Sequence, residues 1–572
     1  MTGSYAIVAV VVVAAATALI GSLGLRVSRT TSDFYVASRT VSPRLNGAAI
    51  SGEYLSAASF LGIAGLVLTQ SSDVLWYPLG YTAGYLVMLL FVAAPLRRSG
   101  AYTLPDFVEL RLGSKRVRRV AGAFVLGIGW LYLLPQLQGA GLTLQTVTGA
   151  PRWVGGVVVA VVVTANVVAG GMRSITFVQV FQYWLKLTAL LVPLVFLLLA
   201  WHADGSPSPT AGHQVFHRAT VVQADQTVRI TVDRPVRITV NGTVDGRPHE
   251  AVPVTLPPGG HTVEGRLAFP PGAAVPDRAG DPVDSAWGRP VAGSGESHPL
   301  YAVYGLILAT FLGAMGLPHV AVRFYTSPDG RAARRTTLVV LGLLGAFYLL
   351  PPVYGALARL YAPDLALTGD TDMAALLLPE RLIGGPGGAL LGALLVGGAF
   401  AAFLSTSSGL AVSLAGVLHQ DVLPSIGIRG FQRATVLAVA APTLCALVVP
   451  DLPAANAVGL AFAVAASAFC PQLLLGIWWT GLTPPGAIAG AVTGGGAALA
   501  AAGLTMVDWF PGGWPHALLA WPAVWSVPLG FLVMVLVSLA TPGSVPARTA
   551  ATMARLHLPE PAGAAGDRGG RR

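Results

Sequence analysis

Long apolar runs separated by short polar segments dominate this chain. They cover residues 5–25, 46–70, 74–96, 119–148, 152–171, 174–200, 301–325, 336–361, 386–418, 433–450, 454–479, 485–506 and 517–540. A run of about 20 apolar residues is long enough to cross the hydrocarbon core of a bilayer as an α-helix. The pattern therefore predicts an all-α polytopic membrane protein with about 13 transmembrane helices.

Residues 201–300 interrupt this pattern. The segment is polar and rich in Pro, Gly and Asp, and its stretches 227–233 and 236–242 alternate apolar and polar residues. The second stretch ends in Asn241-Gly242, and alternation beside an Asn-Gly pair is typical of a β-hairpin. We therefore expect a small β-rich insertion here. A lid that captures substrate is a second interpretation of the same segment.

The composition supports a membrane protein, since 54% of the residues are apolar and only 10% are charged. Soluble domains carry roughly 25% charged residues, so a soluble enzyme or a nucleic-acid binder is excluded as the first interpretation despite the net charge of +10. Lys115 and Lys186 are the only lysines, and this bias towards arginine indicates a high-GC bacterial genome. Cys445 and Cys470 lie in apolar segments, so neither a disulfide framework nor a metal cluster is implied.

The basic residues predict the orientation. The first apolar run has no basic residue before it, whereas Arg26 and Arg29 follow it, so we expect a retained helix with its N-terminus outside. The inner segments then carry 23 basic residues and the short outer segments carry three. The expected protein spans a bacterial plasma membrane, with the C-terminus cytoplasmic. Its organisation is spans 1–6 in residues 1–200, an extracytoplasmic insertion at 201–300, spans 7–13 in 301–540, and a disordered tail at 541–572.

The second apolar run contains a carboxylate, Glu53, among glycines and hydroxyl residues. An ionisable group inside the membrane indicates a functional site, because burying a charge in lipid is costly. The alternative is a structural hydrogen bond in a polar crevice. The glycines, which include Gly47 and Gly52, favour a helix that unwinds within the membrane. Unwinding frees backbone carbonyls, which is tolerated at that depth where they line a cavity or bind an ion.

A second polar cluster, Ser405-Thr406-Ser407-Ser408, lies in the run 386–418. Such hydroxyls can bond back to carbonyls of their own helix. Together with freed carbonyls they can also form a neutral oxygen site, which suits a monovalent cation better than Ca²⁺ or Mg²⁺.

Several motifs together resemble those of the sodium:solute symporter family. They are Asp33-Phe-Tyr-Val-Ala-Ser-Arg39, Tyr54-Leu-Ser-Ala-Ala-Ser-Phe-Leu-Gly62, Gln136-Leu-Gln-Gly-Ala-Gly141, Gly170-Gly-Met172 and Gly316-Leu-Pro-His319. The resemblance covers most of residues 30–425 outside the insertion. The variants present, with Arg323-Phe324 among them, are most similar to the acetate/monocarboxylate permease branch. The resemblance implies LeuT-type inverted five-helix repeats, with helices added at both ends.

The resemblance also implies a sodium site. In the family, two carbonyls of the broken first core helix and a carbonyl and two hydroxyls of the eighth core helix hold the ion. The matching residues here are Gly52, Leu55, Ala402, Ser405 and Thr406. Asp421 fits the family position sixteen residues after the first hydroxyl. A one-residue slip on the broken helix would replace the first two residues by Ser51 and Tyr54.

A small anionic substrate needs hydrogen-bond donors, and we expect Ser56, Gln136 and Thr310 to bind it. His319 is a possible proton-linked group or a structural residue. Gln179 stands where sugar-carrying members have an Asp, so either the sodium exit path differs or protons replace sodium.

Lys186 lies further along the same run as Gln179. One interpretation is that its side chain snorkels towards the membrane surface, and another is that it pairs with a partner that the sequence does not identify.

The sequence thus predicts a secondary active symporter that couples sodium influx to uptake of a small solute, without an enzymatic step or a cofactor. A short-chain monocarboxylate such as acetate or pyruvate is the expected solute. Proton coupling or another solute, such as an amino acid, is the alternative. A polytopic membrane enzyme, a transporter-like sensor module and a channel are more remote.

Overall fold

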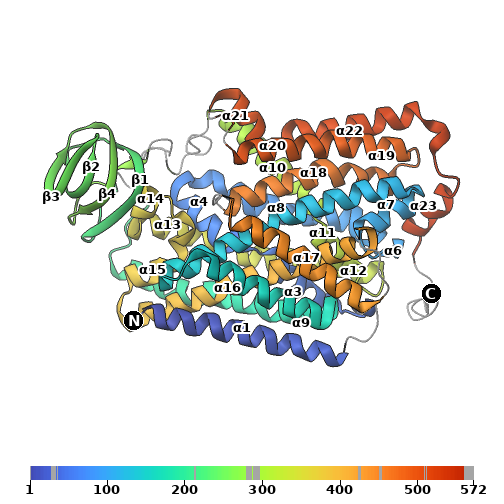
Figure 1. Ribbon diagram of the computed structural model, residues 1–572, viewed down its shortest axis with the longest axis horizontal. Coiled ribbons are helices and arrows are strands. Elements are labelled where there is room, and N and C mark those ends of the chain that lie inside the picture. The colour runs from blue at the N-terminus through green and yellow to red at the C-terminus, as the bar shows by residue number, and fades with distance from the viewer. Residues whose placement is uncertain are drawn as a thin grey trace.

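Helices that run roughly side by side along one direction make up most of the computed structural model (Figure 1). The structure describes residues 2–27, 34, 36–210, 214–278, 287, 297–422, 427–449, 454–507, 509–510 and 512–559. Asp33 and Tyr35 of the first motif and residues 560–572 of the tail lie outside the described residues.

The helices before the insertion correspond to the first six predicted runs. They are α1 (Thr2–Val27), η1 (Ala37–Arg39), α3 (Pro43–Tyr54), η2 (Ala58–Gly62), α4 (Ile63–Gln70), η3 (Ser71–Leu75), α5 (Trp76–Val87), η4 (Met88–Val92), α6 (Ala93–Ser99), α7 (Leu104–Leu112), α8 (Lys115–Thr148) and α9 (Arg152–Ala203).

The helices after the insertion cover the remaining predicted runs and also include short helices between and after them. They are α10 (Pro299–Gly316), α11 (Pro318–Phe324), α12 (Gly330–Tyr348), α13 (Pro351–Tyr361), α14 (Asp364–Thr368), η6 (Thr371–Met373), α15 (Ala374–Leu382), α16 (Gly385–Val417), η7 (Leu418–Val422), α17 (Ile428–Ala446), α18 (Ala454–Trp478), α19 (Pro484–Gly490), η8 (Ala491–Gly495), α20 (Gly496–Met506), α21 (Gly513–Ala520), α22 (Ala523–Ala540), η9 (Pro542–Ser544) and α23 (Thr549–His557).

Among the described residues, ten helices are long and apolar enough to cross a membrane, and one further pair, Pro43–Tyr54 with Ala58–Gln70, bends by 71°. The 52-residue α9 contains two of the predicted runs, because the chain reverses at Gly171 with φ +55°. A Cβ atom at Gly171 would lie 2.6 Å from the Phe34 Cα, so this reversal requires glycine. The predicted all-α membrane fold is confirmed, and the exact number of spans stays a prediction.

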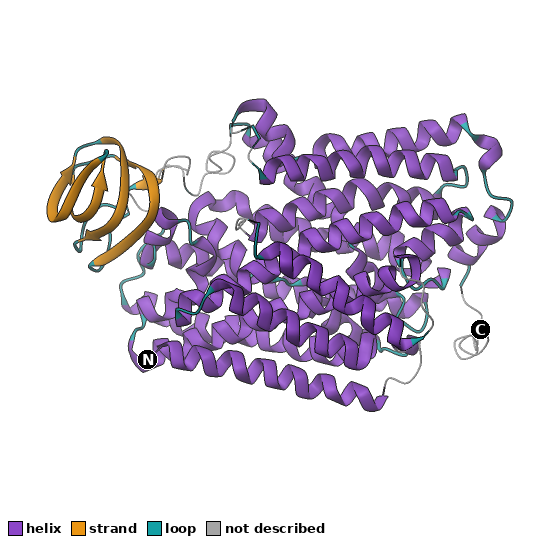
Figure 2. Cartoon of the chain, viewed as in Figure 1, coloured by secondary structure: helices purple, strands orange, loops and turns teal. Residues whose placement is uncertain are grey.

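The insertion is a five-stranded antiparallel sheet beside one end of the bundle (Figure 2). Its strands are β1 (Thr220–Val232), β2 (Val236–Val244), β3 (Arg247–Leu256), β4 (Gly259–Phe269) and β5 (Asp277–Arg278), in the order β3-β2-β4-β1-β5. The expected turn at Asn241-Gly242 is wrong, since these residues form a bulge within β2. The β2–β3 turn is Asp245-Gly246, where both residues have positive φ. Asp-Gly suits such a turn as well as Asn-Gly does.

The C-terminal tail is more ordered than predicted. The α23 helix packs against the bundle, where Leu556 is fully buried and Arg98 donates hydrogen bonds to the carbonyls of Leu556 and His557 at 3.3 and 3.1 Å. The prediction of disorder is therefore wrong for residues 549–557. The Pro- and Gly-rich composition of the whole tail does not indicate this short helix.

The α1 helix begins at the end of the bundle that carries the sheet, and α23, the last helix, lies at the other end (Figure 1). Which end faces the cytoplasm remains a prediction.

Candidate functional site

The first core helix is broken between α3 and η2. The backbone leaves the helical region at Leu55 (φ −74°, ψ 83°), and Ser56 N–H donates to the Tyr54 carbonyl at 2.9 Å. The α3 helix reaches α9 with little space between the backbones, because a Cβ atom at Gly52 would lie 2.3 Å from the Gln179 carbonyl oxygen. The glycine in the motif thus permits the approach, and the break frees the carbonyls at Gly52 and Leu55 from regular helical bonding.

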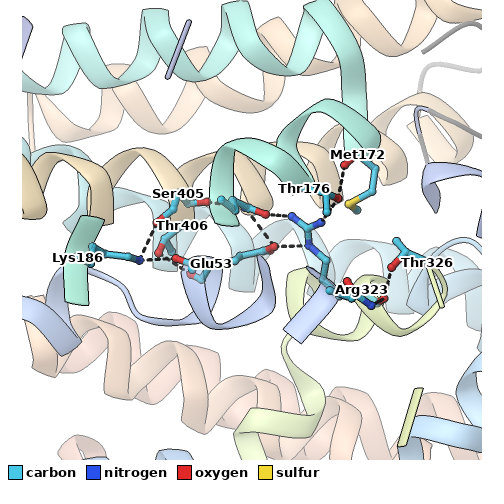
Figure 3. A network of polar contacts seen from close by, with 11 residues as sticks. Glu53, Met172, Thr176, Lys186, Arg323, Thr326, Ser405 and Thr406 are labelled. Carbon is cyan, nitrogen blue, oxygen red and sulfur yellow. Dashed lines mark hydrogen bonds and ion pairs between the residues drawn. The ribbon is translucent and has the colours of Figure 1, made fainter. Parts of the chain in front are cut away.

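The side chain of Lys186 points into this break from α9 (Figure 3). Its Nζ donates hydrogen bonds to the Gly52 carbonyl, to the Leu55 carbonyl at 2.7 Å and to the Ser405 Oγ on α16 at 3.0 Å. The side chain is fully buried, so the interpretation that Lys186 snorkels to the membrane surface is wrong.

Ala402 and Thr406, the other two predicted cation ligands, lie in the same cluster. The Ser405 hydroxyl donates to the Ala402 carbonyl at 3.1 Å, and the Thr406 hydroxyl donates to the Glu53 carbonyl at 2.6 Å. The structure thus brings all five predicted residues to the interface of α3 and α16. Whether they hold a sodium ion is a prediction that this geometry does not test.

The carboxylate of Glu53 forms a buried ion pair with Arg323 of α11 (Figure 3). Its Oε2 accepts hydrogen bonds from Arg323 Nε at 2.6 Å and from Gln179 Nε2 at 3.3 Å. Arg323 also donates to Gln179 Oε1 and to Thr176 Oγ1, the latter at 3.0 Å. The pair connects α3, α9 and α11, and Gln179 Nε2 extends it to the Ser405 carbonyl at 2.9 Å.

Gln136 of α8 lies on the other side of the break. Its Oε1 accepts a hydrogen bond from the Ala57 N–H at 3.2 Å, and its Nε2 is buried without a hydrogen-bond partner among the described residues. Ser56 is also buried, and its hydroxyl has no hydrogen-bond partner among the described residues. Of the predicted substrate residues, Ser56 and Gln136 therefore lie together at the break.

His319 begins the second half of another broken helix, directly after the break between α10 and α11. Its ring packs edge-on against Tyr132, with centroids 5.3 Å apart, and neither ring nitrogen has a hydrogen-bond partner in the part of the chain that the structure describes. The side chain is buried close to the Gln136 side of the break.

Aromatic side chains surround these donors. Tyr132 and Tyr54 each lie 6.1 Å from Phe462 of α18 between ring centroids, and Tyr54 lies 4.8 Å from Tyr85 of α5. These rings form an apolar surface next to a small group of polar atoms, which is typical of a site for a small organic ligand.

Thr310 behaves differently from the other predicted substrate residues. Its hydroxyl donates to the Leu306 carbonyl of its own helix at 2.7 Å. The same hydroxyl lies against α5, because a Cβ atom at Gly80 would be 2.0 Å from it. No hydrogen bond in the described structure connects Thr310 with Ser56 or Gln136, and its substrate role stays a prediction.

Asp421, at the end of η7, belongs to a charged cluster around Arg118 of α8. Arg118 contacts Asp421, Glu109 at 2.5 Å and Asp106 at 2.8 Å. This cluster ties α16 to α7 and α8 at the end of the bundle away from the sheet (Figure 1).

Sequence reasoning missed two participants in the site. Arg323 is part of the Arg323-Phe324 motif, four residues after His319, but nothing in the sequence identifies Glu53 as its partner. Lys186 is recognisable as a lysine inside an apolar run, but its partners are distant in the chain, since Gly52 and Leu55 lie more than 130 residues before it and Ser405 lies 219 residues after it.

A helix broken beside a buried oxygen cluster, packed against a second helix that supplies hydroxyls, defines a multi-pass secondary transporter of the LeuT type. The chain belongs to the sodium:solute symporter family, whose model matches residues 34–225 and 293–494. This confirms the predicted family, and the transporter character of its relatives confirms that the chain is not an enzyme.

Two relatives cover most of the chain. A monocarboxylic acid transporter of Corynebacterium glutamicum is 32% identical over 82% of this chain and 78% of its own length. The uncharacterized symporter YwcA of Bacillus subtilis is 30% identical over 88% of each chain.

Two solved structures share the fold. A Na⁺-coupled sialic acid symporter in a substrate-bound outward-open state matches with a TM-score of 0.57, at 12% identity, over 93% of this chain and 98% of that one. Mhp1, a transporter of the nucleobase-cation-symport-1 family, matches in a closed conformation with a TM-score of 0.52, at 10% identity, over 92% and 99%. At these identities the likeness extends to the fold alone.

Proposed function

We propose that this protein takes up a short-chain monocarboxylate, such as acetate or pyruvate, in symport with a cation across a bacterial plasma membrane. The observation that carries the proposal is the buried Gln136 Nε2, a donor without a partner in the described structure, beside the break in the first core helix. Membership of the family implies a small solute and sodium ions as substrates. The relative from Corynebacterium glutamicum, whose name gives the substrate class, supports a monocarboxylate.

A carboxylate fits the chemistry of this side of the break. It accepts hydrogen bonds only, and both Gln136 Nε2 and a protonated ring nitrogen of His319 can donate. The helix Ala58–Gln70 begins at the break, and its first N–H groups carry positive partial charge. These donors solvate one anionic group without a buried cation in direct contact.

The aromatic surface favours a short acyl chain. Tyr54 and Tyr132 each lie 6.1 Å from Phe462 between ring centroids, so apolar ring surface adjoins the donors at the break. A methyl or acetyl group can contact these rings, whereas the hydroxyls of a sugar would lose hydrogen bonds to water without equivalent partners.

Uptake of radiolabelled acetate and pyruvate into proteoliposomes tests the proposal. We expect excess propionate to inhibit this uptake, and excess glucose or proline to leave it unchanged. Inhibition by glucose or proline alone would assign the protein to another substrate class.

The proposed orientation places the sheet and the N-terminus outside the cell. A cysteine introduced at the exposed Asn241, in a chain whose two native cysteines are replaced, is expected to react with an impermeant maleimide on intact cells. Labelling only after the cells are permeabilised would reverse the orientation.

The family resemblance assigns the driving cation to the oxygen cluster of Gly52, Leu55, Ala402, Ser405 and Thr406. Sodium is the ion that the family name implies. Proton coupling is the second candidate, and it is favoured by one specific observation, the position of the Lys186 ammonium among these oxygens.

A further inference from the structure

The ammonium group of Lys186 has a complete set of partners. It has three N–H donors, and three oxygens accept from it, namely the carbonyls of Gly52 and Leu55 and the hydroxyl of Ser405. The distances of 2.7 and 3.0 Å to the latter two are those of ordinary and charge-assisted hydrogen bonds. The partners come from both halves of the cluster, α3 and α16, whereas Lys186 comes from α9.

These partners are neutral, which distinguishes Lys186 from an ordinary buried ion pair. The nearby carboxylate of Glu53 receives its hydrogen bonds from Arg323 and Gln179. The group that Lys186 binds is therefore a set of backbone and hydroxyl oxygens, which is the kind of donor set that binds an alkali cation.

We propose that the Lys186 ammonium is the resident cation of this site, that it takes the place of a sodium ion, and that transport consequently does not require sodium. Three of the five oxygens that the family resemblance assigns to sodium accept hydrogen bonds from Lys186. A sodium ion entering the cluster would compete for the same lone pairs and face a like charge at contact distance. The side chain is attached to α9, so this cation cannot leave with the substrate.

The proposal rests on the proposed function for its consequence in transport, and it adds a reason for the substrate class. In the buried network, Glu53 and Arg323 form an ion pair, and the ammonium that we propose at Lys186 adds one positive charge. A neutral sugar would gain nothing from this charge, whereas a monoanion bound on the other side of the break would be attracted to it.

Sodium binding to the purified protein in detergent tests the proposal directly. We expect no saturable binding of radiolabelled sodium to the wild-type protein. In the Lys186→Met protein, the oxygens that the ammonium occupied become available, and we expect saturable sodium binding that a further Ser405→Ala substitution weakens by about tenfold or more. The matched control is Lys115→Gln. It changes the other lysine of the chain, which is exposed, and the variant should behave as the wild type.

Two outcomes would overturn the proposal. One is saturable sodium binding to the wild-type protein that Ser405→Ala removes, a measurement that does not depend on the folding of any Lys186 variant. The other is a Lys186→Met protein that is monodisperse, melts cooperatively and binds no sodium. The sodium-binding assay contains no substrate, so its result does not depend on what the protein transports. A failure to transport monocarboxylates would therefore refute the proposed function alone.

Discussion

The two sides of the break in the first core helix differ in how their polar groups are used. On the side of α9 and α16, the Lys186 ammonium has three acceptors, and Arg323 bonds to Glu53, Gln179 and Thr176. On the side of α8, Gln136 Nε2 and both ring nitrogens of His319 are buried without hydrogen-bond partners in the described structure. Only one residue of the chain, Ser56, separates Leu55, whose carbonyl accepts from Lys186, from Ala57, whose N–H contacts Gln136.

This difference separates a side where the two buried basic side chains, Lys186 and Arg323, are paired from a side where buried nitrogen atoms need a ligand. Buried polar groups in proteins are almost always hydrogen-bonded, and leaving one unpaired costs about 1–3 kcal/mol. The side that contains Lys186 therefore holds α3, α9, α11 and α16 together. The side that contains Gln136 carries an energetic cost that a bound carboxylate can offset.

Removing one partner of the buried ion pair should have the largest effect on stability. The Arg323→Met substitution leaves the Glu53 carboxylate buried without its counter-charge, at a cost of about 3–5 kcal/mol. We expect a lower melting temperature and a lower yield of monodisperse protein. The Glu53→Gln/Arg323→Met double variant should recover part of this loss, and a single variant as stable as the wild type would show that the pair does not hold the helices together.

Removing a donor from the other side should affect binding, and it should cost less stability than breaking the ion pair, since only the hydrogen bond from the Ala57 N–H is lost from the folded protein. The Gln136→Leu substitution deprives a buried carboxylate of a hydrogen bond, which corresponds to about 1–3 kcal/mol, or roughly a tenfold to hundredfold loss of apparent affinity. Competition by unlabelled acetate and pyruvate in transport assays measures this loss.

The matched control is Gln138→Leu on the same helix, because Gln138 donates to the Val449 carbonyl on another part of the bundle at 2.9 Å. An equal loss of affinity in both variants would mean that Gln136 has no special role in substrate binding.

The smallest effect is expected at Thr310. Its hydroxyl bonds to its own helix, so Thr310→Val keeps the shape of the side chain and removes no contact to the Gln136 side of the break. We expect a change in apparent affinity below about twofold, since no hydrogen bond to substrate is lost. A loss of apparent affinity comparable with that of Gln136→Leu would show that Thr310 does bind the substrate.

Much of this site could be predicted from the sequence, because its parts are local. Glycines around Glu53 indicated a break, and consecutive hydroxyls at Ser405 and Thr406 indicated an oxygen cluster, so each half was recognisable within a few residues. The family resemblance supplied the pairing of the two halves, and the structure brings them together.

The occupant of the cluster could not be predicted in the same way. Lys186 lies on a third helix, and whether its long side chain reaches the break depends on how closely α9 packs against α3. That packing is set by the glycine at position 52, whose contact with the Gln179 backbone is visible only in three dimensions. The same limit applies to Arg323, which the sequence presents as part of a basic segment and the fold buries against Glu53.

The central claim is that a tethered ammonium takes the place of sodium, and substrate counterflow tests it most directly. Proteoliposomes loaded with unlabelled pyruvate are diluted into labelled pyruvate at one pH, with either sodium or potassium on both sides of the membrane. This exchange needs no ion gradient, so it reports only whether the carrier requires sodium to bind and translocate its substrate. The account predicts initial rates that agree within about twofold, because the cluster already contains its cation. Counterflow that is about tenfold or more faster in sodium than in potassium would contradict it.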